Sequence, residues 1–162
     1  MAALDFNAAL NMKADEVKAV PVPPVGHYVW QVTGIGEINN DNETWQMINI
    51  PVQAVSVFDD ADDVDRSALA DYGKVTNIRN RVTFMFNKKE GTEADLIALQ
   101  NRIKRFCIDV LKIEDGESKT LKELLSLVKN KRFVAPITHV QDRRDPSGET
   151  LQANLGKMAP LV

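Results

Sequence analysis

Two arginines stand at alternate positions at the start of the segment RNRVTFMFNKK. Side chains of a β-strand alternate between its two faces, so Arg79 and Arg81 would share one face. Val82 and Phe84 fall on the other face, which is therefore predicted to be the core side. An open strand face that carries arginines is suited to hold a phosphate backbone.

The net charge of the 162-residue chain, −3, conceals an asymmetry between its two parts. Residues 1–73 carry 3 Lys and Arg against 12 Asp and Glu, a net charge of −9. Residues 74–162 carry 17 against 11, a net charge of +6. This division favours a basic surface that attracts an anion and an acidic segment that repels or regulates. Alternatively, the two parts neutralise each other on a solvated surface.

Cations gather at two further places in the second part of the chain. One is the start of KRFVAPITHVQ, and the other is the polar turn DRRDPSGE, in which Asp-Pro-Ser-Gly is a turn signal. Binding a single strand requires cations that follow its phosphates and flat side chains that stack on its bases. The candidate phosphate contacts are Arg79, Arg81, Lys131, Arg132, Arg143 and Arg144, with Lys88, Lys89 and Lys157 as further candidates.

Strand parity separates the aromatic side chains into core and surface candidates. Tyr28 and Trp30 share an apolar face, which favours the core for both rings. Trp45 has the opposite parity from Ile48, so it is predicted outside the core. We expect it near the arginines around Arg81 if the two strands pair, which makes it the best base-stacking candidate.

Other chemistries are less favoured by the residue spacing. No third ligand at metal spacing accompanies His27 or His139, so neither a metal nor another cofactor is expected. Cys107 lies within a helical pattern and is interpreted as a buried structural thiol rather than a nucleophile. The acidic run DDADDVD, residues 59–65, lacks the glycine and terminal Glu of a calcium loop. We therefore predict no enzymatic activity.

The elements that must position these residues follow from periodicity and turn signals. Strands are predicted at 27–37, 45–58, from about 76, at 132–141 and at 150–158, with a turn-rich loop at 38–44. Helices are predicted at 92–113 and 121–129, each with a candidate capping box at its start. Pro51 marks an edge position or a bulge within its strand. Residues 1–20 are expected to form an N-terminal arm, and 21–162 a single domain.

Three strands, one or two helices and two further strands form the order of an OB-fold. This predicts a mainly β protein with helices, built as a five-stranded Greek-key barrel with its helices between the third and fourth strands. The ligand surface of that fold is the outer face of the second and third strands, flanked by two loops. On that plan, Arg79 and Arg81 lie on the binding face, and Arg143 and Arg144 lie in a flanking loop.

Three stretches resemble phage-encoded single-stranded DNA-binding proteins. PPVGHYVWQVTGIGE is similar to their entry into the first strand, KRFVAPITHVQDRRDPSGETLQANLGKMAPL to their last hairpin, and DFNAALN to their acidic–aromatic start. The resemblance implies an OB-fold and sequence-independent binding of single-stranded DNA. Two departures weaken any transfer of partner recruitment: NNDNET replaces a Lys-rich loop, and GKMAPLV replaces an acidic tail.

The favoured hypothesis is a phage-type single-stranded DNA-binding protein that acts in replication or recombination. Its expected location is the cytoplasm of the host cell, since one cysteine and no long apolar run indicate a reducing compartment without a membrane span. Expected partners are single-stranded DNA, with RNA left open, and replication or recombination proteins; the oligomeric state is also left open. The alternatives are an OB-type interaction module whose basic face meets an acidic partner and, less favoured, a metal-dependent nucleic-acid enzyme.

Overall fold

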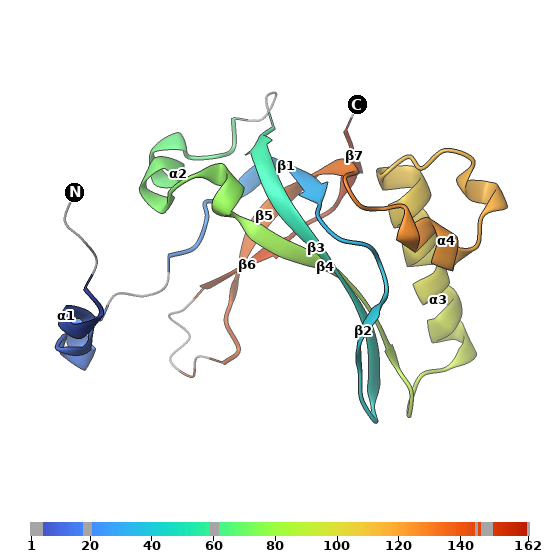
Figure 1. The fold of residues 1–162 in the computed structure, drawn as a ribbon, viewed down its shortest axis with the longest axis horizontal. Helices are drawn as coiled ribbons and strands as arrows, with labels where there is room; N and C mark the ends of the chain where they lie inside the picture. The colour runs from blue at the N-terminus through green and yellow to red at the C-terminus, as the bar shows by residue number, and fades with distance from the viewer. Residues whose placement is uncertain (1–4, 18–20, 59–61, 145, 147–150, 162) are drawn as a thin grey trace.

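The computed structural model describes residues 5–17, 21–58, 62–144, 146 and 151–161 (Figure 1). Its strands are β1 (Gly26–Val32), β2 (Ile38–Asp41), β3 (Trp45–Val57), β4 (Arg79–Asn87), β5 (Arg132–Gln141), β6 (Leu151–Leu155) and β7 (Ala159–Pro160). Its helices are α1 (Phe6–Leu10), α2 (Arg66–Tyr72), α3 (Glu93–Lys104) and α4 (Leu121–Ser126). A π-helical segment, Arg105–Val110, continues α3.

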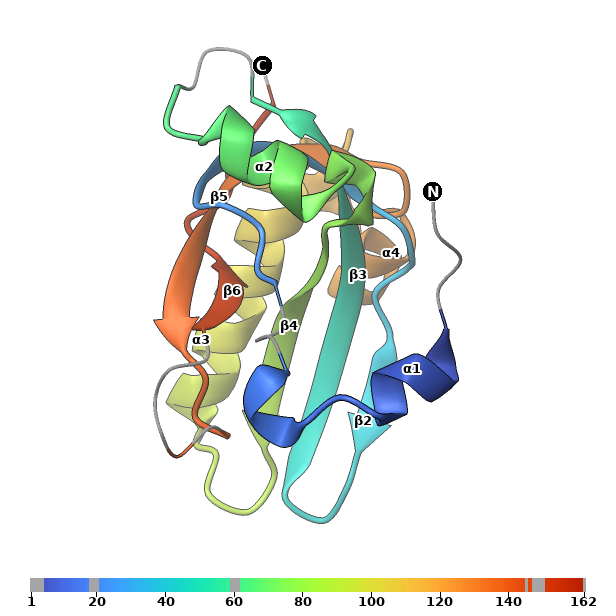
Figure 2. The same ribbon diagram turned by 90° about the vertical axis from the view of Figure 1, so that its left-hand side faces the viewer.

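The strands form one sheet in which every described pairing is antiparallel. The main path runs β4–β3–β1–β5–β6, while β2 also pairs with β3 and β7 also pairs with β5. Figure 2 shows α2 at one end of this sheet and the tip of the β2–β3 hairpin at the other. The predicted mixture of sheet and helices is confirmed.

The predicted closed barrel of five strands is not confirmed, because the sheet stays open between β4 and β6. The Asn80 side chain of β4 donates a hydrogen bond to the Ala153 carbonyl of β6 at 3.1 Å. No backbone ladder joins these two strands in the described part of the chain. After Leu155 the chain stays beside β5: the Gly156 amide donates to the Pro136 carbonyl at 2.8 Å, and β7 pairs with the same strand.

The inner face of the sheet is apolar and is closed by the helical layer. Tyr28 and Trp30 are fully buried, which confirms the parity prediction for both rings. Phe106 of the π-helical segment packs between Phe84 and Phe133, with ring centroids 5.9 and 5.8 Å apart. Burying each such side chain contributes about 1.5–3 kcal/mol, so this aromatic contact fixes the helical layer against β4 and β5.

The two helix starts differ in their capping. At α3, the Thr92 side chain accepts from the Asp95 amide, and the Asp95 carboxylate accepts from the Thr92 amide, which confirms the predicted capping box. At α4, the Thr120 hydroxyl accepts from the Glu123 amide but donates to the Glu123 carboxylate, so the reciprocal backbone bond is replaced. Both arrangements satisfy an amide that helix geometry leaves without a partner.

Two elements appear where the sequence predicted none. Residues 38–44 are predicted as a loop, but β2 pairs there with β3, and the Asn39 side chain adds bonds to both backbone groups of Asn49 where the register shifts. Helix α2 follows the acidic run because Asp65 caps it, accepting from the amides of Ser67 and Ala68. Strand β4 starts three residues later than predicted, after a 3-10 turn at Val75–Asn77.

Pro51 lies inside β3 at a local edge. It is paired with Arg81 of β4 on one side, and its carbonyl accepts from the Thr33 amide on the other. Because the N and O atoms of a strand residue point to the same side, the missing Pro51 donor faces the gap between β1 and β2. β3 has partners on both sides, so Pro51 marks a local break in the pairing rather than an edge strand, and no ladder bond is lost.

The N-terminal residues that the structure describes lie away from the sheet (Figure 1). None of the residues of α1 or of the following 3-10 turn, Ala14–Glu16, is buried. Within the described residues, no helix has the length and apolar character needed to cross a bilayer.

Candidate nucleic-acid interface

A row of polar side chains crosses four strands on the outer face of the sheet. Arg132 of β5 lies opposite Gln31 of β1, Gln31 lies opposite Gln53 of β3, and Gln53 lies opposite Arg79 of β4. Directly opposite residues of paired strands share a face, so this row presents two arginines with two amides between them. Arg132 Nε donates to Gln31 Oε1 at 3.0 Å, which holds one end of the row in place.

A hollow of about 1010 Å³ lies between Arg81, two residues after Arg79 on β4, and the hairpin of β5 and β6. We call it the basic hollow. It brings Arg81 of β4 together with Arg143 and Arg144 of the hairpin turn, far apart in sequence. The described residues that complete its lining are Val140, Gln141, Asp142, Gln152 and Asn154.

The two arginines of the hairpin turn are not equivalent. Arg144 donates from Nε and Nη2 to the two carboxylate oxygens of Asp142, both at 3.1 Å. These hydrogen bonds raise the pKa of Arg144 and place a negative charge directly against it. No ion pair of Arg143, Arg79 or Arg81 is found among the described residues. The positive charge of the basic hollow therefore comes mainly from Arg81 and Arg143.

The cations beyond the far end of β4 are paired with carboxylates. Lys88 Nζ lies 2.7 Å from Asp41 Oδ1, and this hydrogen bond lowers the pKa of Asp41. Lys89 Nζ lies 4.0 Å from Glu43 Oε2. Both carboxylates come from the β2–β3 hairpin, whose tip stands beside the turn after β4 (Figure 2). Lys88 and Lys89, further candidates from sequence, thus each face a carboxylate that competes with a phosphate for them.

Uncharged side chains occupy the outer face of β3 and β4 between the arginines at the start of β4 and the lysines that follow its end. The Thr83 hydroxyl donates to the Asn49 side-chain oxygen at 2.9 Å, and Met47 lies opposite Met85. The outer face of β3 and β4 thus changes from arginines, through an amide and hydroxyl group, to methionines. Such groups contact a nucleic acid without a fixed donor and acceptor code for one base.

The predicted position of Trp45 beside the arginines is wrong. Trp45 has the predicted parity, but it lies opposite Asn87, whereas Pro51 lies opposite Arg81. Six residues of strand separate the two positions, about 20 Å at 3.3 Å per residue. Trp45 begins β3 and Arg79 begins β4. Because the two strands are antiparallel, their first residues lie at opposite ends of the ladder. Trp45 is half-buried in a 410 Å³ hollow against α3.

Lys131 and Arg132 lie at the side of the face away from β4. Lys131 is exposed just before β5, where its backbone carbonyl accepts from the Val32 amide. Lys157, the remaining further candidate, lines a separate pocket between β4 and the helical layer, together with Arg102 and Arg105. The sequence interpretation missed these last two arginines because their helical pattern was used only to identify the core stripe.

The acidic run has structural roles where it is described. Asp63 accepts from His27 Nδ1 at 2.7 Å and from the His27 amide at 3.1 Å, which lowers the pKa of Asp63. Asp65 caps α2. The first two acids of the run, Asp59 and Asp60, lie outside the described residues. Cys107 is fully buried, and burial raises its pKa to about 12, in agreement with the predicted structural thiol.

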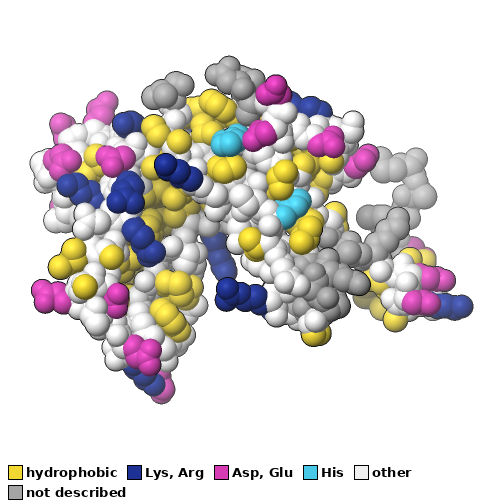
Figure 3. Space-filling model, turned by 180° about the vertical axis from the view of Figure 1, so that it is seen from behind, with side chains coloured by type: hydrophobic (Ala, Val, Ile, Leu, Met, Phe, Trp, Pro, Cys, Tyr) yellow, Lys and Arg dark blue, Asp and Glu magenta, His cyan; other side chains and the backbone are white. Residues whose placement is uncertain are grey.

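Figure 3 shows Lys and Arg side chains along the seam between the α3 side of the molecule and the β6 side, with hydrophobic atoms between them. The polar row on the outer face and the basic hollow carry cations suited to bind a flexible polyanion. Comparison with protein-family models and with curated proteins finds no match for this chain.

Proposed function

We propose that this chain is a sequence-independent single-stranded DNA-binding protein without enzymatic activity. The observation that carries the proposal is that Arg81 meets Arg143 in the basic hollow and shares its strand face with Arg79, with no ion pair to any of the three within the described chain. Unpaired guanidinium groups spaced along one face can follow successive phosphates.

The strand pairing supports the OB-type architecture of this proposal. β1, β3, β4, β5 and β6 have the order and partners of the five strands of an OB-fold, apart from the missing ladder between β4 and β6. Helix α3 stands between the third and fourth of these strands, as that fold requires. In an OB-fold the equivalent of the β3–β4 outer face, with the loop after β5, binds oligonucleotides.

The same face supports binding with little preference for base sequence. Its uncharged part consists of methionines, amides and one hydroxyl group, such as Met85, Asn49 and Thr83. A single strand exposes its bases, which can lie against these side chains, while a duplex offers mainly its backbone. A role in replication or recombination, together with proteins of those processes, is part of the proposal.

One observation favours a second candidate, a protein-interaction module whose basic face binds an acidic partner. Strand-binding OB-folds stack bases on exposed aromatic rings. Among the described residues, Phe6 is the one aromatic side chain that is exposed, and it belongs to α1 rather than to this face. Trp45 offers at most a half-buried ring there.

The two candidates are separated by a direct binding experiment. Fluorescently labelled oligothymidine, a duplex of the same length and polyglutamate are titrated separately with the full chain. The proposal predicts tight binding to oligothymidine, weaker binding to the duplex and the weakest binding to polyglutamate. Polyglutamate binding at least as tight as oligothymidine binding would favour the interaction module, and no binding to oligothymidine would refute the proposal.

A further inference from the structure

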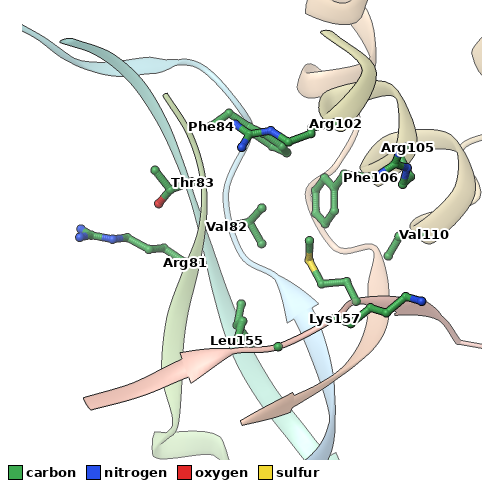
Figure 4. A pocket seen from close by; sticks show the side chains of 12 residues that line it. Arg81, Val82, Thr83, Phe84, Arg102, Arg105, Phe106, Val110, Leu155 and Lys157 are labelled. Carbon is green, nitrogen blue, oxygen red and sulfur yellow. The ribbon is translucent and has the colours of Figure 1, made fainter. Parts of the chain in front are cut away.

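A second pocket lies in the gap left open between β4 and the segment after β6. We call it the seam pocket (Figure 4). It has a volume of about 400 Å³ and is bounded by β4, by α3 with its π-helical continuation, and by the residues that follow β6. Its apolar lining consists of Val82, Phe84, Phe106, Val110, Leu155 and Met158.

The rim of the seam pocket is cationic. Arg102, Arg105 and Lys157 stand around the apolar lining, while Arg81 extends from β4 away from it (Figure 4). None of the described residues that line the pocket is a carboxylate. Arg81 also lines the basic hollow, so it marks the boundary between the two sites.

The aromatic rings of the seam pocket are already engaged, which argues against a stacked base as its occupant. Phe106 contacts both Phe84 and Phe133, and the guanidinium carbon of Arg102 lies 5.9 Å from the Phe84 ring centroid. A base needs an open ring face, whereas an inserted apolar side chain needs only an apolar cavity. The fitting ligand is therefore a peptide with apolar anchors and nearby carboxylates.

This chain carries such a peptide at its N-terminal side. In α1, Phe6 and Leu10 are four positions apart, so they share one helix face, and they are 77% and 67% exposed. Asp5 caps this helix, and Asp15 and Glu16 follow it in an exposed turn. The segment thus presents two apolar anchors with three carboxylates and one cation, Lys13, and its net charge of −2 complements the cationic rim of the seam pocket.

We propose that the seam pocket binds residues 5–16 of a second copy of this chain. In Figure 1, α1 lies on one side of the sheet and α3, which borders the pocket, on the other, so a neighbouring copy is the natural donor. The donor and acceptor surfaces differ, so the contact is heterologous and can continue from copy to copy as an open row. Of Arg79, Arg81 and Arg143, the residues proposed to contact phosphates, Arg81 alone lines the seam pocket. The contact between copies should therefore form whether or not the chain binds DNA.

A peptide-binding experiment tests the contact in the absence of DNA. The probe is a fluorescently labelled peptide of residues 5–17, and the acceptor is the full chain with Phe6→Ser and Leu10→Ser, which cannot supply its own anchors. We expect saturable binding that weakens as salt is added. Replacing Phe6 by Ser in the peptide should weaken binding about tenfold, the effect of losing one buried apolar anchor.

Acceptor variants locate the contact. Arg102→Glu with Arg105→Glu changes two exposed side chains of the rim, so the fold is retained and peptide binding should fall by about tenfold or more. Lys88→Glu with Lys89→Glu is the matched control, with the same charge change outside the pocket, and should retain binding. Equal losses in both variants, or no peptide binding, would overturn the proposal.

Sedimentation of the chain itself supplies the second measurement. The parent chain should show concentration-dependent association that Phe6→Ser with Leu10→Ser abolishes. If the parent sediments as a monomer at every concentration, the contact between copies does not exist. If Arg102→Glu with Arg105→Glu weakens oligothymidine binding but not peptide binding, the seam pocket belongs to a nucleic-acid path and the proposal is wrong.

Discussion

The two ends of the ladder between β3 and β4 carry similar charges but differ in what surrounds them. At one end Arg79 and Arg81 face outward without an ion pair in the described structure, and at the other Lys88 and Lys89 face Asp41 and Glu43. Two cations mark each end. The comparison shows that a count of cations along a strand does not define an anion site, because the neighbouring strands decide which charges remain available.

The difference arises from the residues that each end meets. Opposite Arg81 and Arg79 stand Pro51 and Gln53, and neither carries a charge. At the other end, the tight hairpin of β2 and β3 delivers carboxylates beside the turn that follows β4. Exposed ion pairs of this kind contribute about 0–1 kcal/mol. Lys88 and Lys89 can therefore still bind a phosphate, but less strongly than cations without a carboxylate partner.

The largest expected effect comes from removing the two arginines of β4. Each phosphate contact contributes about −0.7 to the logarithmic salt slope, or about fivefold in affinity at about 0.1 M salt relative to 1 M. Arg79→Ala with Arg81→Ala should therefore weaken oligothymidine binding about 25-fold in a fluorescence anisotropy titration. Lys88→Ala with Lys89→Ala is the control and should change affinity by about twofold at most. Similar losses of affinity in both variants would contradict the claim that Arg79 and Arg81 bind phosphate more strongly than Lys88 and Lys89.

A smaller effect should separate Arg143 from Arg144 within the basic hollow. Arg143→Ala should weaken binding about fivefold, the contribution of one phosphate contact. Arg144→Ala should have less effect, because Asp142 already accepts two hydrogen bonds from the Arg144 guanidinium. Isothermal titration with oligothymidine measures both, and a greater loss for Arg144→Ala would show that the pair with Asp142 opens on binding.

Asp41→Asn should make the Lys88 end of the β3–β4 ladder resemble the end that carries Arg79 and Arg81. It removes the acceptor of Lys88 and should raise oligothymidine affinity about twofold at low salt, with the gain lost at high salt. Lys88 lowers the pKa of Asp41 below its ordinary value of 3.8, so the pair is complete above that pH and is lost only as the pH falls through the lowered pKa. The ratio of the oligothymidine affinities of Asp41→Asn and the parent should therefore stay constant from about pH 8 to about pH 5. A ratio that changes in this range would contradict the pairing of Lys88 with Asp41.

Tryptophan fluorescence reports how far a bound strand extends along the face. Trp30 is buried and donates to the Ala135 carbonyl at 3.0 Å, so Trp45 should give the response. Oligothymidine long enough to reach from Arg81 to Trp45 should quench the emission, and Trp45→Phe should abolish the quenching with an affinity change below about twofold. Quenching that persists in Trp45→Phe would identify Trp30 as the reporter and place the strand elsewhere.

Much of the fold could be predicted from local pattern. The strand at 132–141 has the predicted bounds, because its apolar residues stand between clear polar boundaries. β2 could not be predicted, since its residues INND show no apolar alternation and all four are exposed. It is held by its ladder with β3 and by the bonds of the Asn39 side chain to the backbone of Asn49, contacts that the sequence of β2 alone does not indicate.

The candidate site was predictable in its face but not in its positions. Strand parity placed Arg79 and Arg81 outward, but it fixes a face and not a distance along the ladder, so the location of Trp45 was wrong. The partner of Lys88 is 47 residues away, and such pairing depends on the hairpin that the sequence did not reveal. Ion pairs between separate elements are the part of a site that local patterns leave undetermined.

The dependence of oligothymidine affinity on salt, measured for the parent, Arg81→Ala and Lys88→Ala, tests the central claim most directly. The proposed phosphate path predicts a steep logarithmic slope for the parent, a slope about 0.7 shallower for Arg81→Ala and an unchanged slope for Lys88→Ala. Arg81→Ala with the parent slope, or Lys88→Ala with the shallower one, would contradict the assignment of the arginine end as the phosphate site.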